Sequence, residues 1–105
     1  MAADDDATPQ AAYAALRDDG AVLIDVREPW ENEQARIPGA VLIPLGEVPD
    51  RLADIPDDRE VYIHCRTGGR SSRAVVFLRE HGRGRVRNVA GGIEAWREAG
   101  LPVSE

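Results

Sequence analysis

Lysine is absent from this 105-residue chain, and cysteine occurs only once. Without lysine the chain has no ε-amine for a Schiff base, and it lacks the residue that a phosphate-binding P-loop requires. A single cysteine excludes an internal disulfide bond and a zinc site made of cysteines alone. Because His64 and His81 do not stand at metal-ligand spacing from Cys65, we predict no metal site, and the sequence implies no cofactor.

Long hydrophobic runs are also missing, since no apolar stretch approaches the roughly 18 residues of a membrane span. The acidic N-terminus, residues 1–6, has no apolar segment of the kind found in secretory signals. We therefore expect a cytoplasmic protein that does not contact membranes. The formal net charge of −6 argues against nucleic acid as a partner, because DNA and RNA are polyanions.

The charge is unevenly distributed along the chain. Residues 1–60 hold 15 acidic residues and 5 arginines, whereas residues 61–105 hold 4 acidic residues and 8 arginines. The only cysteine therefore lies in a basic segment of an acidic protein. This asymmetry is compatible with an anion-binding site and equally with charges spread over solvated faces.

Short apolar runs of β-forming residues alternate with helical patterns. Thr8 is a candidate N-cap, with Pro9 at the first helical position. Four apolar runs are predicted to be strands: residues 21–26, 40–43, 61–64 and 86–89. Strands that alternate with helices predict a mostly parallel sheet with helices on both faces. We expect residues 1–7 to form a flexible tail and residues 8–105 to form one α/β domain.

Cys65 ends the third predicted strand, and the loop that follows it leads into a helix expected to begin near Ser71 or Ser72. Gly68 and Gly69 can adopt positive φ, which lets such a loop curl until its N–H groups converge. The helix N-terminus adds further N–H donors and the positive end of its dipole. The pattern therefore predicts a cradle for an anion at the sulfur of Cys65.

A free thiol has a pKa near about 8.5, and the cradle together with Arg66 and Arg70 is expected to lower it until the thiolate predominates at neutral pH. No neighbouring base is then needed. His64 precedes Cys65 on the strand and should point to the opposite face, so we predict a structural role for it. Each of these residues also has a simpler interpretation. Cys65 could pack as a small hydrophobic residue, and Arg66 and Arg70 could serve only solubility. Thr67 could be a loop residue without a role in the pocket.

Four motifs together resemble the rhodanese family. They cover residues 25–29 after the first long strand, 37–40 before the second, 65–71, and 88–92 with Trp96 four residues later. The resemblance extends from Thr8 to Val103 and implies a compact sheet of four to five strands. It also implies transfer of sulfane sulfur from a donor such as thiosulfate through a persulfide on Cys65.

The resemblance assigns substrate binding to the loop that follows the nucleophile: Arg66, Thr67, Gly68, Gly69, Arg70 and Ser71. Asp25 and Arg27 are expected to brace the rim of the site by an ion pair, and Gly91 and Gly92 to let a second loop approach closely. The family often has Gly-His before the 37–40 motif, whereas this chain has Ala35-Arg36.

Loop length separates the enzymatic alternatives. Cysteine phosphatases and a related branch of this fold place the arginine six positions after the nucleophile, whereas here Arg70 comes five positions after Cys65. The shorter loop resembles sulfurtransferases and disfavours a phosphatase or an arsenate reductase. A non-catalytic sulfur carrier or protein-interaction module of the same fold stays open. The implied partners are small-molecule sulfur donors and acceptors (thiosulfate, cyanide or thiols) and a sulfur-relay protein.

Overall fold

The computed structural model describes residues 5–105, which form an α/β domain around one four-stranded sheet. The strands are β1 (Val22–Asp25), β2 (Val41–Leu42), β3 (Val61–His64) and β4 (Val86–Asn88). Their order across the sheet is β2-β1-β3-β4, and every pairing is parallel. The predicted parallel sheet is confirmed, with all rather than most of its strands parallel.

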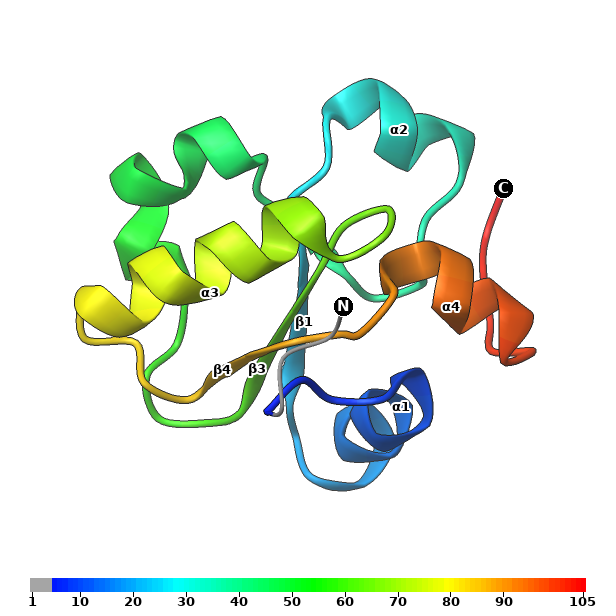
Figure 1. Cartoon of the computed structure of the whole chain (residues 1–105), viewed down its shortest axis with the longest axis horizontal. Helices are drawn as coiled ribbons and strands as arrows, with labels where there is room; N and C mark the ends of the chain where they lie inside the picture. The colour runs from blue at the N-terminus through cyan, green and yellow to red at the C-terminus, as the bar shows by residue number, and fades with distance from the viewer. Residues whose placement is uncertain (1–4) are drawn as a thin grey trace.

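The helices cover both faces of this sheet (Figure 1). The helical segments are α1 (Pro9–Asp18), α2 (Pro29–Gln34), the 3₁₀ segment η1 (Leu45–Asp54), α3 (Gly69–Glu80) and α4 (Gly92–Glu98), of which α2 buries no residue in the core and lies beyond the carboxyl ends of the strands. One core cluster joins α3 and η1 to one face, and a second cluster joins α1 and α4 to the other. Burial of such apolar clusters supplies the main driving force for folding.

The alternation of side chains along β3 assigns the site residues to faces. Ile63 and Cys65 belong to the cluster under α3, whereas Tyr62 belongs to the cluster under α1 and α4. Because neighbouring strand residues point in opposite directions, His64 shares the Tyr62 face and points away from the sulfur of Cys65. The orientation predicted for His64 is therefore confirmed.

The N-terminal segment differs in part from the expected tail. Residues 1–4 lie outside the described residues. Ala7, however, is buried and forms a parallel bridge to Val89, donating its N–H to the Asn88 carbonyl at 2.8 Å. The ordered backbone thus begins before Thr8, which caps α1 as predicted by accepting the Ala11 N–H at 3.1 Å. An alanine is small enough to pack where the acidic residues before it would not.

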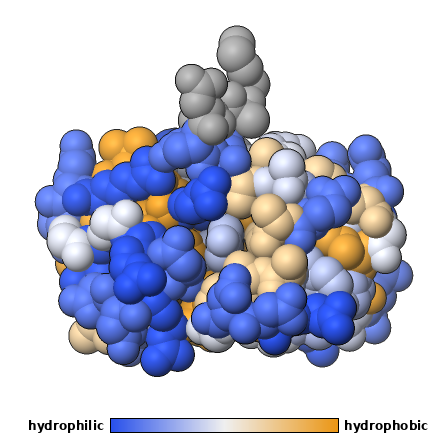
Figure 2. Space-filling view, turned by 90° about the horizontal axis from the view of Figure 1, so that it is seen from below, coloured by the Kyte–Doolittle hydropathy of each residue, from blue (hydrophilic) through white to orange (hydrophobic). Residues whose placement is uncertain are grey.

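No helix within residues 5–105 is long and apolar enough to cross a membrane. The face shown in Figure 2 is mostly hydrophilic, with hydrophobic residues confined to small patches. The large hydrophobic side chains exposed among the described residues are Trp30, Val41 and Val76.

Candidate active site

Cys65 directly follows β3, at the edge of the sheet where the carboxyl ends of the parallel strands lie. The loop before α3, the start of α4, and α2 meet at this edge (Figure 1). Ligands of open parallel sheets bind at this end of the strands, because the loops there converge while the strands supply a rigid base.

Three donors converge on the sulfur of Cys65. The N–H of Gly68 lies 3.1 Å from Sγ, the N–H of Ser71 lies 3.4 Å from it, and the Ser71 hydroxyl lies 3.3 Å from it. Gly68 has φ of 110°, a left-handed conformation that only glycine adopts easily, whereas Gly69 has no positive φ and begins α3. Of the two glycines predicted to curl the loop, only Gly68 has a positive φ. The helix begins at Gly69, earlier than the predicted Ser71 or Ser72, so Arg70 and Ser71 lie in its first turn.

The start of α4 fixes the opposite side of this loop. The N–H groups of Ile93 and Glu94 donate to the carbonyls of Cys65 and Arg66 at 2.9 and 3.2 Å. A Cβ atom on Gly92 would lie 2.4 Å from the Cys65 carbonyl oxygen, so only glycine permits this approach. Because the loop carbonyls turn toward α4, the loop N–H groups are left to face the sulfur. The close approach predicted for the Gly91–Gly92 loop is confirmed.

The pKa of Cys65 is lowered from its ordinary value, although two opposing effects act on it. Burial, the largest effect, favours the neutral thiol, because Cys65 is only 1% exposed. Hydrogen bonds from the Ser71 hydroxyl and from the N–H groups of Ser71, Gly68 and Thr67 outweigh it together. The site therefore favours an ionised sulfur without using a histidine as a base.

The two loop arginines are ion-paired within the protein. Arg70 makes a bidentate pair with Glu31 of α2, at 2.7 and 2.9 Å. The Nε of Arg66 donates to Glu94 of α4 at 2.7 Å. The predicted contact of these arginines with substrate stays a prediction. Neither glutamate was identified from the sequence as a site residue, although Glu31 stands in a capping-box pattern three positions after Glu28.

Asp25 and Arg27 form the ion pair expected at the end of β1. The Arg27 guanidinium reaches the Asp25 carboxylate at 2.9 to 3.2 Å and the Ala35 carbonyl at 2.7 Å, which ties α2 to the sheet. Burial opposes ionisation of Asp25, but hydrogen bonds from the side chain and backbone N–H of Arg27 and from the Asn32 amide leave the pKa of Asp25 lowered. The arrangement fits a brace for the rim of the site.

His64 is fully buried, with Nδ1 3.2 Å from the Cys65 carbonyl oxygen and Nε2 3.9 Å from an Asp25 carboxylate oxygen. Burial is the main reason why the pKa of His64 is lowered, and the ring is therefore neutral at neutral pH. This position fits the structural role that we predicted for it.

Asn88 at the end of β4 opens the 88–92 motif, but no role at the site was predicted for it from the sequence. Its side-chain oxygen and the sulfur of Cys65 both lie within reach of the Ser71 hydroxyl, whose single proton only one of them accepts at a time, and its Nδ2 donates to an Asp6 carboxylate oxygen at 3.0 Å. A polar side chain at the end of a buried strand, beside the strand that carries the cysteine, was the available signal. Asn88 orients the hydroxyl that contacts the sulfur.

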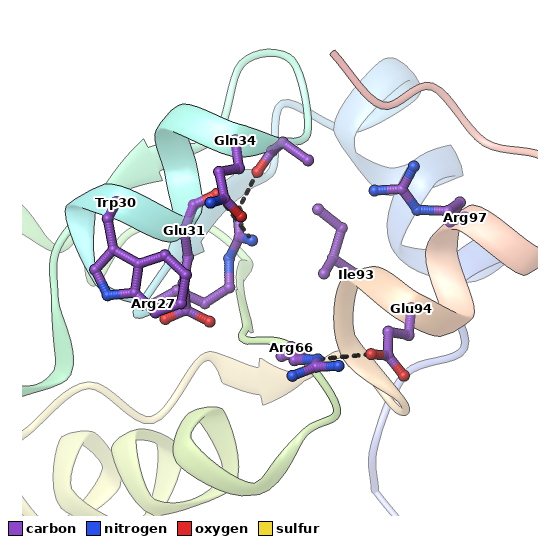
Figure 3. Close-up of a pocket in the computed structure, with 9 residues that line it drawn as sticks. Arg27, Trp30, Glu31, Gln34, Arg66, Ile93, Glu94 and Arg97 are labelled. Carbon is purple, nitrogen blue, oxygen red and sulfur yellow. Dashed lines mark hydrogen bonds and ion pairs between the residues drawn. The ribbon is translucent and has the colours of Figure 1, made fainter. Parts of the chain in front are cut away.

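Two clefts flank the cysteine loop. One has a volume of about 240 Å³ and lies between α2 and α4 (Figure 3). It is lined by Arg27, Trp30, Glu31, Gln34, Ala35, Arg66, Ile93, Glu94 and Arg97. The other, of about 570 Å³, is lined by Asp6, Thr67, Gly68, Gly69, Ser72, Arg73, Asn88 and Gly91. The predicted loop residues therefore gather around the sulfur and between two solvent-accessible clefts.

Comparison with known proteins gives concordant matches. Residues 8–99 match the family model of the rhodanese-like domain. A "Sulfurtransferase" of Allochromatium vinosum is 46% identical over 82 residues, which cover 78% of this chain and 77% of that protein. The "Putative sulfur carrier protein YrkF" of Bacillus subtilis is 42% identical over 75% of this chain, but the match spans only 43% of its length.

Among solved structures, a rhodanese-related protein from Thermoplasma volcanium superposes with a TM-score of 0.86. It is 30% identical, and the match covers 94% of this chain and 96% of that one. The family model covers most of the described chain, and the cysteine cradle lies within the matched residues. The chain therefore belongs to the family of rhodanese-like domains.

Proposed function

We propose that this protein transfers sulfane sulfur through a persulfide on Cys65. The Cys65 thiolate attacks the outer sulfur of thiosulfate or of a persulfide donor, and an Sγ–S bond forms as the S–S bond of the donor breaks. The bonding electron pair leaves with sulfite or with the donor thiolate. The persulfide anion on Cys65 then gives its outer sulfur to cyanide or to an acceptor thiolate, which regenerates the Cys65 thiolate.

The convergence of hydrogen-bond donors on the sulfur is the observation that carries this proposal. The Gly68 N–H, the Ser71 N–H and the Ser71 hydroxyl all lie within 3.4 Å of Sγ. Such donors stabilise an anionic sulfur in the resting enzyme, and the same loop can hold the persulfide anion. The near-complete burial of Cys65 favours delivery of a single terminal atom over transfer of a bulky group.

The named relatives support the same class of chemistry, since one is called a sulfurtransferase and another a putative sulfur carrier. Both names are compatible with small-molecule donors and with a protein that relays sulfur. A carrier would form the Cys65 persulfide but release its sulfur without repeated turnover on small molecules.

The test is to expose the protein to thiosulfate and to measure its intact mass. We expect a gain of one sulfur at Cys65, its loss on addition of cyanide, and steady release of thiocyanate. The Cys65→Ala variant should show none of these. A stable adduct without turnover would identify a carrier, and hydrolysis of an aryl phosphate that disappears in Cys65→Ser would overturn the proposal in favour of a phosphatase.

A further inference from the structure

Both arginines of the cysteine loop already hold carboxylates of the same chain. Glu31 on α2 accepts two hydrogen bonds from the Arg70 guanidinium, and Glu94 on α4 accepts one from Arg66. Arg27, the third arginine of the site, is paired with Asp25. A negatively charged donor that approaches through the cleft between α2 and α4 therefore meets arginines whose charge is balanced.

The two loop pairs differ in how firmly they are held. The side chains of Arg66 and Glu94 are 68% and 48% exposed, so solvent and salt screen this pair. Those of Arg70 and Glu31 are 34% and 11% exposed, and their contact is bidentate. The Arg70–Glu31 pair is therefore the more firmly held of the two.

Glu31 is held in place by its own helix as well as by Arg70. Its Oε1 accepts the backbone N–H of Glu28 at 2.9 Å and so completes the capping box of α2. The hydrogen bond from Arg70 is the main reason why the pKa of Glu31 is lowered, and the carboxylate therefore stays charged at neutral pH. A fixed negative charge thus stands beside Arg70 at the mouth of the site.

We infer that Glu31 is a specificity-determining residue, which selects persulfide donors of single negative charge and disfavours the thiosulfate dianion. This inference rests on the sulfur-transfer function proposed above. Coulomb repulsion from one fixed charge is proportional to the charge of the donor, so the dianion is repelled about twice as strongly in free energy. Glu31 also withholds from the dianion the guanidinium that would otherwise bind its sulfonate group.

Both donor reactions balance in charge and atoms. Thiosulfate gives one sulfur to the Cys65 thiolate and leaves as the sulfite dianion. A persulfide anion gives one sulfur and leaves as a thiolate. The two reactions form the same persulfide on Cys65, so their rates differ only through the donor. Glu31 affects these rates through the charge of the donor.

The test measures the second-order rate constant of Cys65 persulfide formation, by acid quench and intact-mass spectrometry, at about pH 8. The donors are thiosulfate and 2-hydroxyethyl persulfide, whose organic group is neutral. We expect Glu31→Gln to raise the thiosulfate rate constant by about tenfold and the persulfide rate constant by only about threefold. Glutamine keeps a side-chain oxygen that can cap α2 but loses the second acceptor for Arg70, so the change removes the charge and releases the guanidinium while keeping the cap.

Two further variants separate charge from structure. Glu33→Gln removes a charge from an exposed position of the same helix, and both rate constants should change less than about twofold. Glu31→Asp keeps the charge with a shorter reach, and the wild-type preference between donors should persist, whereas a purely structural role predicts that it behaves like Glu31→Gln.

A thiosulfate rate constant that stays unchanged or falls in a folded Glu31→Gln protein would overturn the inference while leaving the proposed function intact. The absence of any sulfur adduct on wild-type Cys65 with both donors would overturn the proposed function and the inference together.

Discussion

Helices α3 and α4 begin in the same way at the same edge of the sheet, yet only α3 presents its N–H groups to the sulfur. Each follows a parallel strand, and each has a left-handed glycine at its N-cap, Gly68 with φ of 110° and Gly91 with φ of 76°. The N–H groups at the start of α3 face the sulfur of Cys65. Those at the start of α4 face the carbonyls of Cys65 and Arg66.

The difference shows that a helix N-terminus becomes an anion site only when no backbone carbonyl is present to satisfy its N–H groups. The α4 terminus is used to hold the cysteine loop, and this makes the α3 terminus available to the sulfur. The two similar helix starts thus have different roles: the start of α4 supports the cysteine loop, and the start of α3 contacts the sulfur. Substitutions that alter one helix start, or its support, at a time can separate these two roles.

The largest effect is expected from Gly92→Ala, which would break the contact between α4 and the cysteine loop. The new Cβ would lie 2.4 Å from the Cys65 carbonyl oxygen, at a residue with φ of 60°. We expect the free energy of unfolding to fall by about 3 kcal/mol or more, and the rate of persulfide formation by more than tenfold. Chemical denaturation and mass spectrometry measure the two quantities.

Gly100→Ala is the matched control, because Gly100 has φ of 78° but open space where its Cβ would stand. It should cost only the strain of the left-handed backbone, about 1 kcal/mol, and leave persulfide formation unchanged. Equal effects of the two substitutions would contradict the supporting role of α4.

Asp25→Asn tests the brace that ties α2 to the sheet beside the two helix starts. It would leave the Arg27 guanidinium buried without its carboxylate, so the free energy of unfolding should fall by about 3 kcal/mol. The pKa of Asp25 is lowered in the fold, so its stabilisation is present above the unfolded-state value of about 3.9 and is lost as pH falls through the folded value. Acid titration of unfolding should show this loss in the wild type and not in the variant.

Ser71→Ala removes one donor from the α3 start and keeps the N–H. We expect the apparent pKa of Cys65, measured from the pH dependence of alkylation by iodoacetamide, to rise, because the variant loses a hydrogen bond that stabilises the thiolate. The rate should therefore fall several-fold near about pH 6 and converge with the wild type at high pH. Ser72→Ala, one residue later in the helix, serves as the control, and an equal shift there would argue against a specific role of Ser71.

The smallest effect is expected from Glu94→Gln at the start of α4. The carboxylate pairs with Arg66 at 2.7 Å, but both side chains are exposed, so the free energy of unfolding should change by less than about 0.5 kcal/mol. A change this small would show that the start of α4 supports the cysteine loop through its backbone N–H groups. A loss above about 1 kcal/mol in thermal or chemical unfolding would instead assign this support to the side chain.

The sequence alone determined the order and type of the main elements. The apolar runs of β1 and β3, the Thr8-Pro9 start of α1 and the glycine turn after Cys65 are local patterns, because period and capping act over a few residues. The N–H groups of the glycine loop and of the helix start predicted the lowered pKa of Cys65. Strand alternation predicted that His64 points away from the sulfur.

Only the tertiary structure decided which groups from distant elements surround the cysteine loop. Glu31, Asn88 and Glu94 come from three different elements, and no local pattern states that they meet around one loop. The same holds for Ala7, whose pairing with Val89 depends on the edge of β4 being open beside it. Sequence patterns act over neighbouring residues, whereas the charge and hydrogen bonding of a site depend on distances that packing sets.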